Sequence, residues 1–311
     1  MLTVQTSGST GSPRQMVVRK DKMEQSARIT CSFLGLKRGD KALLCLPLTY
    51  IAGKMMVVRA LTAGLELIIG KPNGHPLADV NTPIDFVSMT PMQAHNSIQV
   101  PQELERMKAI KVLLIGGGPL SDELEQVLKG FPNVIYATYG MTETLSQIAL
   151  RKLSGGDASE YYTPFSSVKL SLDKDGALVV DAPLVCDEVL HTNDLAELLP
   201  DGRFKIIGRK DNMINTGGLK MQIEVLEEKI RKLFKRNFAI TSVPDAKLGE
   251  AIVLLTEIPI DDRTLAKHLT LYERPRHILT VKLVPLTTSS KIDRAACKKL
   301  AVKMMGNGQT S

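Results

Sequence analysis

Residues 110–118 read IKVLLIGGG, a short and almost continuous apolar run that ends in three glycines. Such a run is typical of a strand that is buried on both faces of a sheet. Ser121, Asp122 and Glu123 follow, and they match the capping residue and the first-turn acids of a helix. The stretch therefore predicts one strand and one helix of a parallel α/β sheet.

The same alternation continues on both sides of this stretch. The sequence predicts a helix over residues 51–63 and strands over residues 41–48, 65–70, 84–90 and 134–140. Apolar strands that alternate with helices imply a parallel sheet with both faces covered. From about residue 165 the strands become shorter and turn signals separate them, so we expect hairpins over residues 168–180 and 196–208.

The last third of the chain reads as a small separate α+β unit that begins after GRKDN (208–212). Its first helix is expected over residues 223–236, where apolar residues recur at helical spacing and acids precede bases. Strands near 238–243, 251–256 and 278–284 and helices near 262–269 and 293–304 complete it. We therefore expect two domains, residues 1–208 and residues 209–311.

Composition narrows the class of protein. The chain has 311 residues, of which 43% are hydrophobic and 23% charged, as in ordinary globular proteins. No apolar run approaches the ~20 residues that span a bilayer, and the N-terminus does not resemble a signal peptide. The four cysteines form no CxxC pair, which is typical of reduced thiols. We expect a cytoplasmic protein with no membrane partner and no zinc site.

The positive charge favours anionic partners. The net charge is +7 and the pI is about 9.1. Tryptophan is absent, aromatic residues make up 4%, and no basic stretch is interleaved with stacking residues, so nucleic acid is not an expected partner. A protein that handles nucleotide phosphates explains the charge. The sequence leaves open whether the protein is a homo-oligomer.

The segment TSGSTGSPR (6–14) concentrates hydrogen-bonding groups close to the N-terminus. Its glycines let backbone amides approach an oxyanion, its hydroxyls add donors, and Arg14 adds a fixed positive charge. The segment does not fit the Walker A pattern. A flexible Ser/Gly surface linker is the alternative. The short length, the apolar flanks and the Pro-Arg ending favour a polyphosphate loop over such a linker.

This segment and five others resemble, in order, the motifs of the adenylate-forming superfamily, which includes acyl-CoA synthetases, luciferases and peptide-synthetase adenylation domains. The other five are IGGGPLS (115–121), YGMTET (139–144), TNDLAE (192–197), GRKDNMINTGGLKM (208–221) and PLTTSSKIDR (285–294). The resemblance implies an adenylate-forming α/β fold with a small C-terminal lid domain. Only five residues precede the phosphate loop, so much of the usual N-terminal segment is expected to be lacking.

The resemblance also implies roles for individual residues. Lys291, Thr142 and Glu143 would be catalytic, Glu143 would bind Mg²⁺, and Asp211 would be the hinge of the lid. Tyr139 would stack on adenine, Asp194 would bind the ribose hydroxyls, and the segment 216–220 would line the path of CoA. The residues expected to bind ATP or CoA are Thr6, Ser7, Gly8, Ser9, Thr10, Gly11, Arg14, Gly117, Gly118, Pro119, Tyr139, Gly140, Met141, Asp194, Arg209, Gly217, Gly218 and Lys220.

Each of these residues also has a plainer explanation. Glu143 could be a helix-start acid, although a carboxylate is a suitable Mg²⁺ ligand beside substrate phosphates. Asp194 could form an Asx turn, and Arg209 could pair with a nearby acid. Lys291 would by itself read as surface charge.

Three positions depart from the pattern of the superfamily. Arg14 stands where lysine is usual, which retains the charge and adds bidentate geometry. Ser290 replaces the usual glycine before Lys291, and Tyr50 replaces a histidine in PLTYIAG (47–53). Tyr50 and Gly53 are expected to line the acyl pocket.

Arg59 suggests which acid is activated. An arginine six residues after Gly53 is found in the o-succinylbenzoate–CoA ligases of menaquinone biosynthesis, where it would bind the second carboxylate of the substrate. A dicarboxylate needs a fixed cation for the carboxylate that does not react. Alternatively, Arg59 lies on the outer face of its helix while Val57, Val58 and Leu61 pack inward, and Lys54 is a second candidate.

The resemblance thus implies a two-step ligase that uses ATP, Mg²⁺ and CoA. A carboxylic acid would attack the α-phosphate of ATP, and CoA would then displace AMP from the acyl-adenylate. Another aryl- or acyl-CoA ligase, or a nucleotide-binding relative without ligase turnover, is the alternative.

Overall fold

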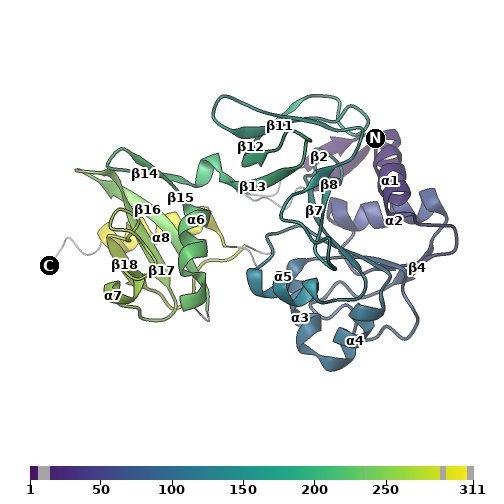
Figure 1. The fold of residues 1–311 in the computed structure, drawn as a ribbon, viewed down its shortest axis with the longest axis horizontal. Coiled ribbons are helices and arrows are strands. Elements are labelled where there is room, and N and C mark those ends of the chain that lie inside the picture. The colour runs from purple at the N-terminus through teal and green to yellow at the C-terminus, as the bar shows by residue number, and fades with distance from the viewer. Residues whose placement is uncertain (6–14, 235, 288–291, 307–311) are drawn as a thin grey trace.

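The computed structural model describes residues 1–5, 15–234, 236–287 and 292–306. Within these ranges the chain forms a larger lobe and a smaller C-terminal lobe, built on four β-sheets (Figure 1). At the N-terminus, β1 (Leu2–Gln5) pairs antiparallel with β2 (Gln15–Val18).

The largest sheet has seven strands in the order β4-β3-β5-β6-β7-β8-β9. The first five strands in this order are parallel, and the last two run antiparallel to their neighbours. These strands are β3 (Lys41–Leu44), β4 (Glu66–Ile69), β5 (Phe86–Met89), β6 (Val112–Ile115), β7 (Val134–Gly140), β8 (Gln147–Lys152) and β9 (Thr163–Pro164). The predicted parallel sheet is therefore confirmed.

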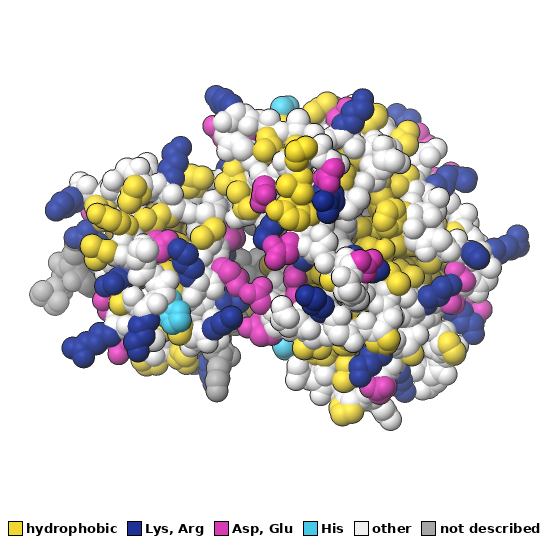
Figure 2. All heavy atoms as spheres, viewed as in Figure 1, with side chains coloured by type: hydrophobic (Ala, Val, Ile, Leu, Met, Phe, Trp, Pro, Cys, Tyr) yellow, Lys and Arg dark blue, Asp and Glu magenta, His cyan; other side chains and the backbone are white. Residues whose placement is uncertain are grey.

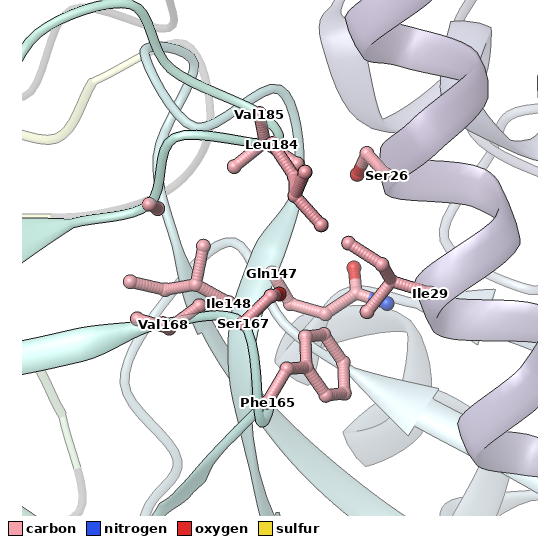
Figure 3. A pocket seen from close by; sticks show the side chains of 10 residues that line it. Ser26, Ile29, Gln147, Ile148, Phe165, Ser167, Val168, Leu184 and Val185 are labelled. Carbon is pink, nitrogen blue, oxygen red and sulfur yellow. The ribbon is translucent and has the colours of Figure 1, made fainter.

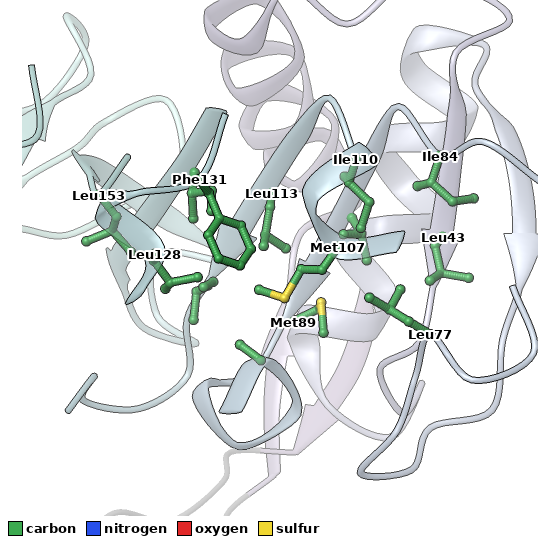
Figure 4. Close-up of a cluster of buried hydrophobic side chains, with 14 of the residues drawn as sticks. Leu43, Leu77, Ile84, Met89, Met107, Ile110, Leu113, Leu128, Phe131 and Leu153 are labelled. Atoms are coloured by element: carbon green, nitrogen blue, oxygen red, sulfur yellow. The ribbon is translucent and has the colours of Figure 1, made fainter. Parts of the chain in front are cut away.

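Helices cover both faces of this sheet because its strands are apolar on both sides. Leu43 and Leu113 face α3 (Pro91–Gln99), α4 (Pro101–Ala109) and α5 (Asp122–Lys129), in the core drawn in Figure 4. The neighbouring residues Leu44 and Leu114 face α1 (Lys20–Leu34) and α2 (Ile51–Ala63). Ser121 caps α5 by accepting a hydrogen bond from the backbone of Leu124, as the sequence predicts.

A four-stranded antiparallel sheet follows in the larger lobe. It contains β10 (Lys169–Leu172), β11 (Ala177–Asp181), β12 (Leu190–Leu198) and β13 (Phe204–Arg209), in sequence order. Both expected hairpins are present, β10–β11 and β12–β13. In the second hairpin Asp194 lies opposite Arg209, and this register matters for the site.

The smaller lobe is a mixed sheet with helices on both faces. Ile240, Ile252 and Leu254 pack under α6 and α7, whereas Val253 and Leu255 pack under α8. Its elements are η1 (Lys210–Asn212), β14 (Met213–Thr216), β15 (Leu219–Gln222), α6 (Ile223–Ile230), η2 (Arg231–Leu233), β16 (Phe238–Asp245), β17 (Gly249–Thr256), α7 (Asp262–Leu265), β18 (His277–Thr280) and α8 (Arg294–Gly306).

Two expected helices are shorter in the structure. The helix predicted over residues 223–236 ends at Ile230 and continues as one 3₁₀ turn to Leu233. Phe234 is extended, and its ring stacks on Phe238 with the centroids 4.3 Å apart, so a tertiary contact overrides the helical pattern. The helix predicted over 262–269 is regular only to Leu265.

None of the helices in the described part of the chain combines the length and the apolar composition needed to cross a membrane.

Candidate active site

Some of the residues predicted to bind nucleotide lie at the carboxyl ends of β6 and β7. In the pairing of these strands, Ile115 lies opposite Ala137, so Gly116 and Gly117 emerge beside Thr138 and Tyr139. A Cβ atom on Gly116 would lie 1.9 Å from Thr138 Oγ1, which explains the need for glycine at this position. Gly117 has a φ of +81° and open space where a Cβ would be. The loop therefore leaves room for a ligand beside Tyr139.

A hydrogen-bonded network links Tyr139 to the second hairpin. Tyr139 Oη donates to Asp194 Oδ2 (2.8 Å), and Arg209 Nη1 donates to Asp194 Oδ1 (2.7 Å). Arg209 also binds Asp211 through Nε and Nη2, at 2.9 and 3.0 Å. Burial and the Asp194 carboxylate raise the pKa of Tyr139. The structure thus brings together Tyr139, Asp194, Arg209 and Asp211, which come from three separate sequence motifs.

The Tyr139 ring packs edge-on against two other aromatic rings. Its centroid lies 5.1 Å from that of Phe204 and 5.9 Å from that of Tyr162. The residue is half-buried, and its expected contact with adenine remains a prediction.

The loop after β7 exposes one carboxylate and is tied down by the next residue. Glu143 is exposed and makes no hydrogen bond or ion pair with any residue that the structure describes. Thr144 is buried, and its Oγ1 accepts from Met141 N (3.0 Å) and lies 2.8 Å from Ser146 O. Leu145 has a φ of 65°, unusual for a residue with a side chain. The loop is therefore held in one shape with Glu143 available for a cation.

Arg59 lies inside the larger lobe, and its side chain reaches the start of β8. The residue is only 2% exposed, whereas Leu61 is 79% exposed, so the alternative that Arg59 faces outward is wrong. Arg59 Nη2 lies 2.5 Å from Ser146 Oγ and 2.9 Å from Gln147 Oε1. Its Nε is buried without a hydrogen-bond partner among the residues that the structure describes.

No carboxylate in the described part of the chain forms an ion pair with Arg59. Burial lowers the pKa of Arg59 to about 10, because its charged form is desolvated. An uncompensated buried cation is costly, and removing it or pairing it with an anion relieves the cost. This guanidinium is therefore suited to bind an anionic group.

The two other expected acyl-pocket residues lie at the start of α2. Tyr50 is the N-terminal cap residue of α2 and is half-buried. A Cβ atom on Gly53 would lie 2.3 Å from Pro47 O, so this glycine is required by the packing of the helix on its preceding loop. Lys54, the second candidate for a substrate cation, is half-buried.

The segment expected to meet CoA forms a tight hairpin. Gly217 and Gly218 have φ values of +58° and +83° in the turn between β14 and β15, and Lys220 is exposed on β15. Both turn residues need glycine for this backbone shape. The contact of this hairpin with CoA remains a prediction.

Polar contacts connect the two lobes. Lys210 Nζ binds Asp173 (2.6 Å) and Asp175 (3.0 Å) at the turn between β10 and β11. Acidic side chains gather in the hollow between the lobes (Figure 2). Asp122 of α5 and Glu228 of α6 are neighbours across the two lobes, and the hydrogen bond with Asp122 raises the pKa of Glu228.

Two groups of residues differ between the sequence analysis and the structure. The predicted phosphate loop, residues 6–14, and the predicted catalytic Lys291 lie outside the described ranges. Four residues that the structure places around the site had no predicted role: Thr144, Ser146, Gln147 and Thr30. Thr144 is the last residue of the YGMTET motif and Ser146 and Gln147 follow it closely, which is the only signal for these three, and the sequence holds no signal for Thr30.

Comparisons with known proteins agree with this geometry. The model of the AMP-binding enzyme family matches residues 3–187. A solved acyl-CoA synthetase (AMP-forming)/AMP-acid ligase II-like protein from Dyadobacter fermentans is 32% identical, with a TM-score of 0.65, over 95% of this chain and 88% of that chain. The 2-succinylbenzoate–CoA ligase of Listeria monocytogenes is 25% identical over 94% of this chain and 68% of that protein.

The fold comparison extends to a complex with nucleotide. The O-succinylbenzoate coenzyme A synthetase of Bacillus subtilis, solved with ATP and magnesium ion, has a TM-score of 0.78 at 20% identity. The match covers 94% of this chain and 68% of that chain. The adenylate-forming fold is therefore confirmed, over a shorter length than in that enzyme.

Proposed function

The chain belongs to the AMP-binding enzyme family and is an AMP-forming acid–CoA ligase, and we propose that its acid is an aromatic dicarboxylate of the 2-succinylbenzoate type. Relatives that span most of the chain carry the name 2-succinylbenzoate–CoA ligase, which supports a role in menaquinone biosynthesis. The single observation that carries the acid class is Arg59, a buried guanidinium with no carboxylate partner among the described residues.

A substrate with two carboxylates fits this guanidinium. One carboxylate must reach the α-phosphate of ATP, and the other needs a cation that does not take part in the reaction. Within the part of the chain that the structure describes, Arg59 has an unpaired Nε and two Nη groups bound only to neutral atoms. A carboxylate accepted there gains charge-assisted hydrogen bonds in a water-poor site. A monocarboxylate would leave the cation buried and unpaired.

The residues of the site fit ATP and Mg²⁺. Asp194 would bind the ribose hydroxyls with the remaining acceptor capacity of its carboxylate, which already accepts from Tyr139 and Arg209. Glu143 would hold Mg²⁺ together with substrate phosphates, and Thr142 lies next to it. The metal neutralises phosphate charge when bound. Tyr139 and the open backbone of Gly117 would form the adenine side of the site.

The reaction proceeds in two steps. A carboxylate oxygen of the acid attacks the α-phosphate of ATP, and pyrophosphate leaves to give the acyl-adenylate. The CoA thiol, as thiolate, then attacks the acyl carbon and AMP leaves with the bonding electrons. The protein contributes orientation and charge stabilisation to both steps.

The lid is expected to serve the two steps with different residues. Lys291 would stabilise charge during adenylation, and the hairpin with Lys220 would contact CoA after the lid turns about Asp211. Lys291→Ala should lower pyrophosphate release by ~10²–10³ and leave thioester formation from supplied acyl-adenylate nearly unchanged. Lys220→Ala should do the reverse. If both variants lose both half-reactions equally, the two-position lid is wrong for this protein.

The acid class is tested by substrate preference. Pyrophosphate release is measured with 2-succinylbenzoate and with two monocarboxylate analogues, 3-benzoylpropanoate and 2-butanoylbenzoate, each with and without CoA. We expect turnover of the diacid with a kcat/KM at least tenfold above that of either analogue. Equal kcat/KM values for the diacid and an analogue would show that no second carboxylate is recognised.

A further inference from the structure

Gln147 connects Arg59 to a different helix through its side-chain amide. Its Oε1 accepts from Arg59 Nη2 (2.9 Å), and its Nε2 donates to Thr30 Oγ1 of α1 (3.0 Å). Thr30 Oγ1 in turn donates to the backbone carbonyl of Ser26 (3.0 Å). Ser146 Oγ also contacts Gln147 Oε1. These contacts form a relay from α1 across β8 to the guanidinium on α2.

The relay fixes which end of the amide faces Arg59. Because Thr30 uses its proton for Ser26 O, its oxygen is left to accept from Gln147 Nε2. The amide oxygen must then point at Arg59. Thr30 is fully buried and Gln147 is 8% exposed, so water cannot easily replace either contact.

The space around Gln147 gives its side chain little freedom. Figure 3 shows it beside Ile29, Phe165 and Ser26, which line a cavity of about 10 Å³. Such a cavity holds at most about one water molecule, so little space is left beside the Gln147 side chain. The direction of the Arg59 donor is therefore set by the amide.

The side chain of Gln147 is neutral, although a glutamate of nearly the same shape would fit at this position. A carboxylate would pair with Arg59 and satisfy its charge within the protein. The amide instead holds the guanidinium in place and leaves its charge uncompensated. Orientation without neutralisation is what a binding site for an anion needs.

We propose that Gln147, held by Thr30, is the positioning residue of Arg59 and thereby sets the preference for a dicarboxylic acid. The inference rests on the proposed acid class, and it assigns to Gln147 and Thr30 a role in specificity. Neither residue touches the reacting atoms. Their effect reaches the substrate through the direction and the free charge of the guanidinium.

Gln147→Glu is the decisive variant because it keeps the shape and adds the missing anion. The KM for 2-succinylbenzoate should rise ~10- to 100-fold, the scale of a charge-assisted bidentate contact. The KM for ATP, the kcat and the turnover of monocarboxylate analogues should change less than about threefold. Thr30→Val should raise the KM for the diacid in the same direction but less, and Thr30→Ser should restore it. Equal losses for diacid and monocarboxylates in Gln147→Glu would overturn the proposal.

Ser26→Ala is the matched control. Ser26 lies one turn before Thr30 and is also buried, and its Oγ has no hydrogen-bond partner in the described ranges. Its removal should leave the KM for the diacid unchanged. A KM shift as large as that of Thr30→Val would show that any change in this helix disturbs the site, and that no relay exists.

Thermal unfolding without ligand separates this inference from the proposed acid class. Gln147→Glu should raise the unfolding temperature, because it supplies a counter-charge to a buried cation, whereas Gln147→Leu should lower it. If Gln147→Glu leaves the unfolding temperature unchanged or lower, Gln147 does not orient a charged Arg59. If the wild-type enzyme shows no preference for the diacid, the proposed acid class is wrong. The unfolding temperatures still test whether Gln147 orients a charged Arg59.

Discussion

Two arginines in this protein, the partly buried Arg294 and the buried Arg59, have opposite surroundings. In the smaller lobe, Arg294 binds Glu227 through Nη1 and Nη2 at 2.5 and 2.7 Å, and Glu227 also accepts from Ile240 N. Burial lowers the pKa of Arg294, but the hydrogen bond and charge of Glu227 outweigh it, so the pKa is raised. In the larger lobe, the partners of Arg59 within the described ranges are all neutral, and burial lowers its pKa to about 10.

The difference separates an arginine that supports the fold from one that is ready for a ligand. Arg294 has its carboxylate within the chain, and the pair ties α8 to α6 and β16. Arg59 has no such carboxylate among the described residues and keeps an unpaired Nε. The same side chain thus has two uses, and the presence of a partner acid decides between them.

The largest expected effect comes from breaking the paired arginine. Glu227→Ala leaves the partly buried Arg294 without its anion and the buried N–H of Ile240 without its acceptor, and should lower the free energy of unfolding by ~2–3 kcal/mol. Urea unfolding measures the loss. Lys298→Ala is the control, since it breaks the more exposed pair with Glu250 and should change the free energy of unfolding by ~1 kcal/mol or less. A small loss in Glu227→Ala would mean that the pair does not support the smaller lobe.

Removing the unpaired arginine should affect binding far more than folding. Arg59→Met keeps much of the volume and removes a desolvated charge, so the free energy of unfolding should change by less than ~1 kcal/mol or increase. The apparent binding of the diacid should weaken by ~1.5–3 kcal/mol, seen as a rise in KM. A loss of stability as large as that of Glu227→Ala would make Arg59 a structural residue like Arg294.

The pH dependence of the two arginines should differ as well. The lowered pKa of Arg59, about 10, predicts a KM for the diacid that is constant to about pH 9 and rises ~tenfold per pH unit above 10. Between pH 10 and the ordinary arginine pKa, the unfolded chain binds more protons at this residue than the folded chain. The contribution of Arg59 to stability therefore increases with pH in that range. Initial rates at pH 7–10.5 test the predicted pH dependence of the KM for the diacid. A KM that stays constant to pH 10.5 would contradict this prediction.

The sequence predicts the regular parts of this fold because their causes are local. The apolar run at 112–115 and the cap at Ser121 each act within a few residues, and both are confirmed. The helix predicted to 236 is shorter because the ring contact of Phe234 with Phe238 is tertiary. The sequence also predicts that Tyr139 and Asp194 belong to one site, through the order of motifs.

The environment of Arg59 could not be predicted in the same way. Helical spacing alone allowed an outward or an inward side chain, and the structure places it inward. Its relay joins Gln147 to Thr30, which are separated by 117 residues. A contact at that distance arises only after α1 packs against the sheet, so no local pattern contains it.

Helix α1 carries one further consequence, for the order in which substrates bind. The helix has fifteen residues and starts just after β2, the strand that follows residues 6–14. It contains Thr30, which accepts from Gln147 next to Arg59. If residues 6–14 bind the phosphates of ATP as the sequence predicts, a shift of α1 on nucleotide binding would also move Thr30 and so couple the two affinities. By linkage, any factor by which ATP tightens the diacid must equal the factor by which the diacid tightens ATP. Calorimetric titration of each ligand with and without the other, using a non-hydrolysable ATP analogue, would measure this cooperativity, and Thr30→Val should diminish it.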